Sequence, residues 1–426
     1  MKLKNQEDWA KIALLVLICS CLLVQGNAQV KTFVREISFE ATYFDSKLSC
    51  RAKGMRELRE IILNEVGVYI ENEQILETTE KDGVFTQDFS EQITTLTAGI
   101  TRSKIIDETW NGKDYWLKAA ITINREDFRE SLQRLLTDRR QMRLFKRTQE
   151  RLELVEAKLD SARKVGEQQA FIDALSENWA IIRHQNGVAS LLSGDTVDAL
   201  KEFNAAIDLN SKMAESYYNI GLISMQRGNL INAIQEFTAA ILSGPEIVDS
   251  YYNRASCRYE LEDYAGAISD INMFTQSIES DFEAFILRGN AKGKLNDYSG
   301  AVNDCTEAIK LKADDPRGYY NRGHERYKMK KYQLAKSDFL VATKFEESAL
   351  IYHRIGDCEG MMQNLSEAIS NYSKAITLDP SYVRSYVSRG FIHSIRGNFR
   401  KACNDWRTAA SLGDVKSSQL AKKYCN

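Results

Sequence analysis

The chain has 426 residues, of which 43% are hydrophobic and 27% charged, and its formal net charge is −2. This balance disfavours wholesale disorder and gives no general case for nucleic-acid binding, while four histidines leave little room for a His-rich metal site. With only three prolines, the composition indicates a large, mostly helical protein and argues against a collagen-like fibre or a many-pass membrane protein.

Residues 1–28 have the layout of a secretory signal peptide. Basic residues precede an apolar run at residues 12–24, which is shorter than the ~20 residues of a membrane-spanning helix. The small residues Gly26 and Ala28 follow, so we expect cleavage between Ala28 and Gln29. A lipoprotein anchored at Cys21 and a buried N-terminal helix are the alternatives. The prediction is an exported protein of the periplasm or cell envelope, either soluble or peripheral to a membrane.

Residues 29–125 are predicted to form a small α+β module. Apolar residues recur at three- and four-residue steps over residues 49–66, which indicates an amphipathic helix. Asn111-Gly112 separates apolar runs at residues 105–110 and 115–124, and this dipeptide is a strong hairpin signal. The second run alternates between apolar and polar residues, so one face of the sheet should rest on the helix. A further strand is predicted at residues 31–43.

Three stretches of this module carry a resemblance to a known family. They are AKGMRELREIILNEVGVYIE from Ala52, TAGI from Thr97 and IDETWNGKDYW from Ile106. Together they resemble the N-terminal domain of the bacterial flagellar assembly T protein and related small envelope lipoproteins. The resemblance implies a non-catalytic α+β module that is used in cell-envelope assemblies.

Residues 126–179 are predicted to form a charged linker helix. No proline or glycine occurs between residues 125 and 162, and apolar residues step by three and four as in a short coiled coil. Within residues 137–151, two acidic residues oppose six basic ones, which we call the basic stripe: Arg139, Arg140, Arg143, Lys146, Arg147 and Arg151. The stripe is interpreted either as a contact with an anionic partner or membrane surface, or as a solvated helix face, which is the commoner case.

The rest of the chain repeats at intervals of 34 residues, with one interval of 33. An alanine column runs through Ala199, Ala233, Ala267, Ala301, Ala335, Ala368 and Ala402. Twelve residues before each alanine lies a small residue, which is glycine in every copy except the third, where it is Ala255. Four residues after the alanine most copies have a bulky residue. Small residues let two helices approach, and bulky ones fill the groove between them.

This spacing resembles the tetratricopeptide repeat, a helix–turn–helix unit that stacks into a right-handed α-solenoid. Seven copies cover residues 180–413, and residues 414–426 are predicted to be a C-terminal capping helix. The expected fold class is therefore mainly α, a right-handed solenoid preceded by a small α+β domain and a long linker helix.

Catalytic motifs are absent from the sequence. It has no phosphate-binding loop, nucleophile elbow or His-Glu-x-x-His motif, and its histidines lack metal-ligand spacing. We therefore expect no catalytic, cofactor-binding or metal-binding residues and no enzyme activity. Cys403 and Cys425 lie at similar distances from a turn near residues 412–414, so an exported chain should join them by a disulfide. Two reduced, buried thiols are the alternative.

Four copies carry an arginine just before the small-residue column and an aspartate sixteen residues later. These pairs are Arg254/Asp270, Arg288/Asp304, Arg322/Asp338 and Arg389/Asp405, and the same copies have a further basic residue four positions after the arginine: Arg258, Lys292, Arg326 and His393. Because arginine occurs only where aspartate occurs, we predict that each pair is in contact. Simple duplication of one ancestral copy is the alternative explanation.

In the tetratricopeptide family the first helix of each copy lines a concave groove, and the resemblance implies a set of partner-binding residues. Rigid amphipathic tyrosines, which are favoured at binding hot spots, are dense in the second, third and fifth copies. The predicted residues are Tyr218, Leu222, Met225, Tyr252, Tyr259, Asn290, Lys294, Tyr320, His324, Tyr327, Lys328, His353 and Phe391. The alternative is that these tyrosines only pack between repeats.

Three functions fit these predictions. The first is an exported, non-enzymatic scaffold that binds protein or peptide partners through the concave face. The second is a structural subunit of a secretion, motility or outer-membrane assembly, docked by its N-terminal module. The third is a glycan- or peptide-binding accessory protein. No cofactor or nucleic acid is implied, and no oligomeric state is predicted.

Overall fold

The computed structural model describes residues 30–41, 46–65 with internal gaps, 102–124 and 139–425. The expected cleavage between Ala28 and Gln29 and the alternative anchor Cys21 lie outside these residues. The chain divides into two compact units, residues 1–139 with 189–194 and residues 140–188 with 195–426, and each is described by itself. Among the described residues, no helix is both long and apolar enough to span a membrane.

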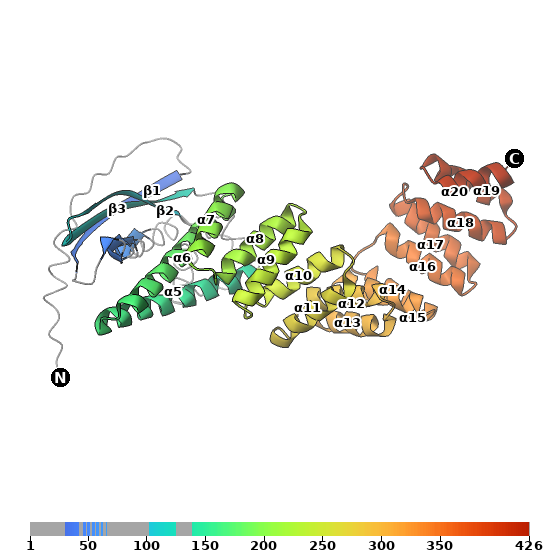
Figure 1. Ribbon diagram of the computed structural model, residues 1–426. Helices are drawn as coiled ribbons and strands as arrows, with labels where there is room; N and C mark the ends of the chain where they lie inside the picture. Colours follow the sequence, from blue (N-terminus) through green and yellow to red (C-terminus); the bar gives the residue numbers. More distant parts are fainter. Residues whose placement is uncertain are drawn as a thin grey trace, which may run out of the picture. The chain divides into compact units, whose positions relative to one another are not determined.

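The first unit contains a three-stranded antiparallel sheet (Figure 1). The central strand pairs with both others, in the spatial order β1 (Val30–Glu40), β3 (Asp114–Asn124) and β2 (Arg102–Trp110). Strands β2 and β3 form the expected hairpin, with Trp110 opposite Tyr115. Gly112 in its turn has a φ of +90°, which glycine adopts without a steric cost.

Helical residues between 47 and 65 pack against this sheet. Cys50, Met55 and Leu58 are buried together with Tyr115 and Leu117 of β3. Full burial of a large apolar side chain contributes roughly 1.5–3 kcal/mol, so this contact is the core of the module. The prediction that a helix rests on a sheet is confirmed for these residues.

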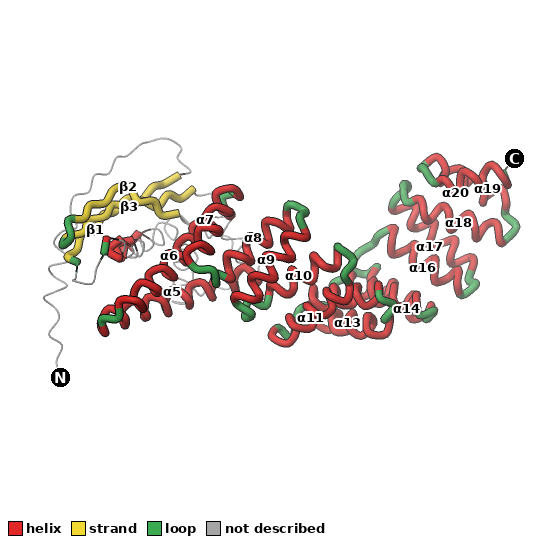
Figure 2. The backbone as a smooth tube through the Cα atoms, viewed as in Figure 1, coloured by secondary structure: helices red, strands yellow, loops and turns green. Residues whose placement is uncertain are grey.

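The second unit is an array of helices joined by short loops, which are green in Figure 2. Within residues 139–425, α5 (Arg139–Val165) precedes seven successive helix pairs, and α20 (Val415–Tyr424) follows them. We call each pair a repeat. The first helices are α6 (Gln168–Leu192), α8 (Ala214–Gln226), α10 (Asp249–Glu260), α12 (Phe282–Lys294), α14 (Pro316–Lys328), α16 (Ala349–Met361) and α18 (Val383–Ile395). The second helices are α7 (Thr196–Leu209), α9 (Leu230–Ser243), α11 (Tyr264–Ser277), α13 (Tyr298–Leu311), α15 (Tyr332–Ala342), α17 (Leu365–Leu378) and α19 (Phe399–Ser411).

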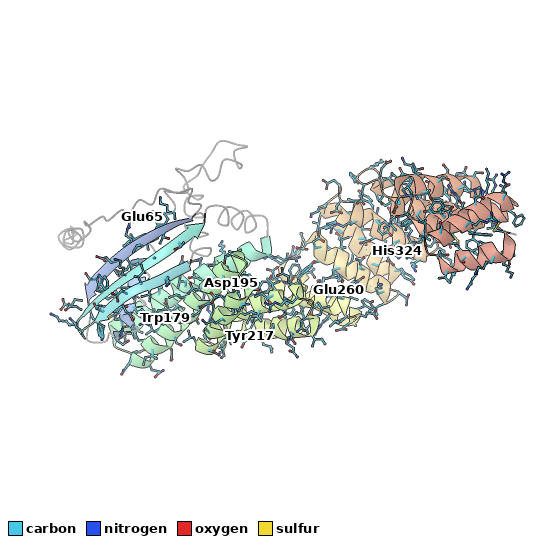
Figure 3. The ribbon with its side chains drawn as sticks, turned by 90° about the horizontal axis from the view of Figure 1, so that it is seen from above. Glu65, Trp179, Asp195, Tyr217, Glu260 and His324 are labelled. Carbon is cyan, nitrogen blue, oxygen red and sulfur yellow. A yellow bond between two sulfur atoms is a disulfide. The ribbon has the colours of Figure 1, made fainter. Side chains whose placement is uncertain are left out.

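One type of turn joins the two helices of every repeat. A residue of positive φ stands in each turn: Gly194, Gly228, Glu262, Asn296, Lys330, Gln363 and Gly397. In the first four repeats the next residue caps the second helix, because its side chain accepts a hydrogen bond from a backbone N–H three residues later. Asp195, labelled in Figure 3, is the first of these caps. The repeat spacing therefore fixes where each second helix begins.

The small-residue column lets the two helices of a repeat touch. A Cβ atom on Gly221 would lie 2.7 Å from the ring of Phe237, closer than such atoms approach in real proteins. In the third repeat the larger Ala255 is matched by Ile271 in place of an aromatic residue, and both are buried. All seven residues of the predicted alanine column are fully buried as well. The predicted α-solenoid architecture is confirmed.

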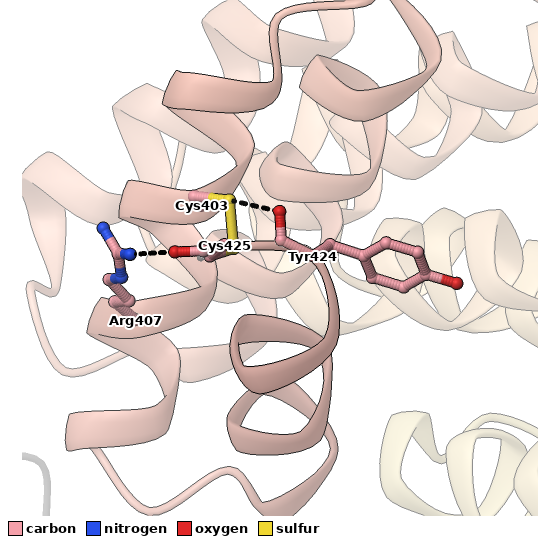
Figure 4. Close-up of a disulfide and its surroundings, with 4 residues drawn as sticks. All are labelled: Cys403, Arg407, Tyr424 and Cys425. Atoms are coloured by element: carbon pink, nitrogen blue, oxygen red, sulfur yellow. Dashed lines mark hydrogen bonds between the residues drawn. A yellow bond between two sulfur atoms is a disulfide. The ribbon is translucent and has the colours of Figure 1, made fainter.

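The last repeat is closed by α20 and a disulfide (Figure 4). Cys403 in α19 is bonded to Cys425, with the two Cα atoms 5.4 Å apart, so the structure contains the disulfide expected from the sequence. Arg407 donates a hydrogen bond to the carbonyl oxygen of Cys425, and the sulfur of Cys403 lies 3.6 Å from the carbonyl oxygen of Tyr424. Trp406 is buried in the same cluster, which covers the end of the array.

Candidate binding groove

Buried aspartates on the second helices are held by arginines on the first helices of the same repeats. In the four predicted pairs an arginine Nη2 lies 2.7–2.8 Å from the aspartate Oδ1, and Nε donates to the same carboxylate: Arg254/Asp270, Arg288/Asp304, Arg322/Asp338 and Arg389/Asp405. Such bidentate pairs are the strong form of this interaction. The predicted contact is confirmed, and we call these pairs the arginine–aspartate column.

The expected second cation is present in three of the four pairs. Arg258, Lys292 and Arg326 each place a nitrogen 2.7–2.8 Å from the aspartate of their own repeat. The equivalent residue of the seventh repeat, His393, is buried, and burial lowers its pKa. His393 is therefore neutral near pH 7 and does not supply a second charge to Asp405.

The same arginines also reach the preceding repeat, which the sequence analysis missed. Each Nη1 donates a hydrogen bond of 2.8–3.3 Å to a polar side chain sixteen residues earlier: Thr238, Asn272, Thr306 and Ser373. The column therefore ties neighbouring repeats together as well as the two helices of one repeat. The constant spacing of sixteen residues on the N-terminal side was a signal that could have identified these partners.

The basic stripe of α5 contacts carboxylates of the first four repeats. Its arginines pair with five acidic residues, which we call the acidic ladder: Glu177, Glu215, Glu246, Asp249 and Asp281. Arg151 lies 2.9 Å from Glu177 and 3.0 Å from Glu215, while Arg143 Nε lies 3.1 Å from Asp249. The interpretation of the stripe as a solvated helix face is therefore wrong for these arginines, because carboxylates of the same chain neutralise them.

Two carboxylates of the ladder are deeply buried. Glu215 is 0% exposed and Asp249 is 4% exposed. Burial raises the pKa of Asp249, and the nearby guanidinium of Arg143 opposes that rise. Beneath Glu215, burial lowers the pKa of His184 to about 4, so this histidine is neutral near pH 7. The positive charge that balances Glu215 and Asp249 therefore comes from α5.

Aromatic and apolar contacts complete the seat of α5. The guanidinium carbon of Arg140 lies 3.3 Å from the ring centroid of Tyr252, which is cation–π geometry. Leu144 is buried in one cluster with Tyr218, and Leu222 and Met225 pack against the same cluster. Four predicted partner-binding residues thus lie in the stretch of the array that α5 covers.

Two predicted partner-binding residues belong to the core. Tyr218 is 1% exposed and accepts a hydrogen bond of 3.0 Å from Asn253, and His353 is 4% exposed with Nδ1 3.2 Å from the hydroxyl of Ser385. Neither side chain can reach a partner from these positions, so both assignments are corrected to packing roles. Tyr320, which packs between Phe339 and the stacked ring of His324, is also partly buried.

Five predicted residues converge on one open cavity of about 430 Å³. We call it the lysine pocket, and it is lined by Tyr259, Asn290, Gly293, Lys294, Asn296, Tyr298, His324, Glu325 and Lys328. Lys294 and Lys328 are exposed. Burial, assisted by the nearby Arg354 and Lys328, lowers the pKa of His324 to about 4, so its ring is neutral near pH 7. Figure 3 labels His324 on α14.

The remaining predicted residues lie apart from this pocket. Tyr327 packs edge-on against Tyr332 in the fifth repeat. Phe391 of the seventh repeat is 45% exposed and contacts Trp406. In the part of the chain that the structure describes, no group of histidine, cysteine or acidic residues is arranged to hold a metal ion.

The most important residues that sequence reasoning missed are the buried acids of the ladder. Glu215 and Asp249 stand 34 residues apart near the starts of two first helices, and Glu283 continues the column. The repeat period was therefore a signal for this acidic column. Its partner helix carries no such period, which is why the pairing was not predicted.

Comparison with known proteins identifies the repeats. Two family models, both described as "Tetratricopeptide repeat", match residues 191–241 with 225–274 and residues 349–382. These residues lie within the first three and the sixth helix pairs. None of the curated proteins matches this chain.

Several solved structures are similar to parts of the array. A tetratricopeptide repeat protein from Parabacteroides merdae is 22% identical, covers 59% of this chain and 99% of its own, and has a TM-score of 0.43. PilF of Pseudomonas aeruginosa is 15% identical, with coverages of 49% and 96% and a TM-score of 0.41. YrrB, described as "a TPR protein with an unusual peptide-binding site", is 18% identical, with coverages of 52% and 97% and a TM-score of 0.32.

Proposed function

We propose that this chain, whose second unit is a solenoid of tetratricopeptide repeats, is a non-enzymatic scaffold that binds a peptide segment of a protein partner in the lysine pocket. Helical repeat arrays are typical protein-binding surfaces. The observation that carries the proposal is the convergence of Tyr259, Asn290, Lys294, His324 and Lys328 on one open cavity. The neighbouring stretch of the array is covered by α5, so the pocket is the part of the predicted groove that is open to a partner.

The lining of the pocket indicates the chemistry of that peptide. Lys294 and Lys328 supply two exposed ammonium groups, and the amides of Asn290 and Asn296 can donate and accept hydrogen bonds. The rings of Tyr259 and Tyr298 offer flat apolar surfaces. Together these groups suit a segment with a carboxylate, from an acidic side chain or a chain terminus, beside an apolar side chain.

Peptides selected from a displayed library on the full chain would test this proposal. We expect the enriched peptides to contain carboxylates and to bind Lys294→Glu/Lys328→Glu at least about tenfold more weakly, because a hydrogen bond to a charged group contributes roughly 1.5–3 kcal/mol. Fluorescence anisotropy measures the affinities. Lys201→Glu/Lys416→Glu is the matched control, because it makes the same change of charge at exposed lysines of α7 and α20. Equal binding by both double variants would contradict the proposal.

We also propose that the protein works outside the reducing cytoplasm, in the periplasm or cell envelope. The disulfide between Cys403 and Cys425 supports this, because disulfides persist in oxidising compartments. Alkylation of whole cells before reduction should leave both cysteines unmodified, and N-terminal sequencing should begin at Gln29. A cytoplasmic pool in which both thiols are alkylated would contradict export, and a lipid-modified Cys21 would replace the expected cleavage site.

A further inference from the structure

The acidic ladder and the lysine pocket are separate surfaces of the same array. The ladder pairs with the arginines of α5 at Glu177, Glu215, Glu246, Asp249 and Asp281. None of these residues lines the lysine pocket. The array therefore offers one surface whose recognition groups are acidic and another whose exposed charges are basic.

The ladder requires a cationic occupant. Among the described residues, every lysine or arginine nitrogen within 4 Å of the buried carboxylates of Glu215 and Asp249 belongs to α5. A buried carboxylate that loses its cation is strongly disfavoured, so the bare ladder is an unfavourable state. Water alone is a poor replacement for α5, whereas another set of guanidinium groups would serve as well.

The seat also has a defined shape. The ring of Tyr252 receives the guanidinium of Arg140, and an apolar cluster with Tyr218 and Phe237 receives Leu144. Its ligand is thus a helix with arginines at steps of three and four residues and a leucine between them. These three features, acids, ring and apolar slot, make the ladder a built site instead of a simple patch of charge.

The two halves of α5 are held by different forces. Val155, Leu152 and Leu159 pack in an apolar cluster with Ala180 and Ile181 of α6, which fixes the C-terminal half. The half from residue 140 to residue 151 is held mainly by charge. The side chains of Arg143 and Arg147 are 37% and 29% exposed even when paired, so water can solvate them again when this half detaches.

From these observations we propose that the acidic ladder is a second binding site, which takes an arginine-rich amphipathic helix of a partner, and that α5 is its resident, displaceable occupant. A tethered occupant competes at a high effective concentration, so an external helix binds weakly until the tethered one is weakened. This inference is independent of the lysine pocket and of the peptide proposed to bind there.

A labelled peptide with the sequence of residues 139–165 is the probe. It is titrated by fluorescence anisotropy against the full chain carrying Arg143→Gln/Arg147→Gln, in which the resident helix is weakened. We expect binding at least about tenfold tighter than to the unchanged chain. Lys146→Gln/Lys164→Gln is the control, because it removes two charges from exposed positions of the same helix. The control should bind the peptide as weakly as the unchanged chain does.

A second variant locates the binding. Adding Glu215→Gln/Asp249→Asn to the Arg143→Gln/Arg147→Gln chain should reverse the gain in affinity, with circular dichroism confirming that the array is folded. Equal peptide binding by the arginine and lysine variants would overturn the proposal. So would binding that survives Glu215→Gln/Asp249→Asn in a folded chain. An unchanged chain that forms dimers dissociated by the peptide would place the α5 of a second copy in the ladder and would contradict intrachain occupancy.

Discussion

The array neutralises its buried acids in two different ways. In the third, fourth, fifth and seventh repeats, the aspartates of the arginine–aspartate column are paired with arginines of the same repeat. At the ladder, Glu215 and Asp249 are paired with arginines of α5, which precedes the repeats. The first arrangement is part of every repeat that carries it, whereas the second depends on a helix that is not a repeat.

This difference separates rigidity from exchange. An arginine of the column also donates to the preceding repeat, so breaking its pair disturbs two helix–helix contacts and one repeat junction. An arginine of α5 bonds only one side of the array and stays partly in water. The same chemistry, a guanidinium on a buried carboxylate, therefore stabilises the fold in one region and defines an exchangeable surface in the other.

The largest expected effect is in the column. Asp338→Asn removes the negative charge that faces Arg322 and Arg326, whose side chains are only 16% and 21% exposed. We expect the free energy of unfolding in urea to fall by about 3 kcal/mol, because two cations stay mostly buried without a partner. Glu307→Gln is the control, since its pair with Lys310 is exposed and should contribute less than about 1 kcal/mol. Equal effects of both variants would remove the distinction between built-in and surface pairs.

His184 should make the ladder region sensitive to acid. Its pKa is about 4 in the folded chain, chiefly because of burial, and 6.5 is its ordinary value. The unfolded chain therefore takes up a proton first as the pH falls below about 6.5, and stability declines from there towards pH 4. At pH 5 the loss is about 2 kcal/mol. Urea unfolding at pH 7 and pH 5 should show this loss in the unchanged chain and a clearly smaller one in His184→Asn, and identical losses would contradict burial of a neutral imidazole.

Asp249→Asn should have a smaller effect on the array than Asp338→Asn. The neutral amide needs no cation, and Arg143 can turn into water, so we expect a change of about 1 kcal/mol or less in the urea unfolding of the repeats. Limited proteolysis should nevertheless cleave α5 near residues 140–151 faster than in the unchanged chain. A loss as large as that of Asp338→Asn would mean that the ladder is as much a part of the fold as the column.

The smallest expected effect is that of salt. Between 0.1 M and 1 M sodium chloride the screening length falls from about 10 Å to about 3 Å, which weakens partly exposed ion pairs most. Hydrogen exchange of residues 140–151 should become a few-fold faster, while exchange in α12–α15 should stay unchanged. Equal responses in both regions would show that charge does not distinguish them.

The sequence by itself determined the repeats and the contacts within them. Gly221 and Phe237, or Arg322 and Asp338, stand at a constant offset on the two helices of one repeat, so a period of 34 residues implies that they meet. The same logic places the turn before Asp195 and the hairpin at Gly112, because each depends on a few neighbouring residues. The cysteines at positions 403 and 425 were assigned to each other in the same way, across one turn between two helices.

Only the tertiary structure decided which surfaces stay open. The spacing of Arg143 and Arg147 shows that they share a helix face, but which carboxylates they meet depends on where α5 lies against repeats up to a hundred residues away. That placement covers the surface around Tyr252 and leaves the surface around Lys294 and Lys328 open, although all three were equivalent predictions from the sequence. Contacts between distant segments depend on packing and burial summed over many residues, and no local period encodes them.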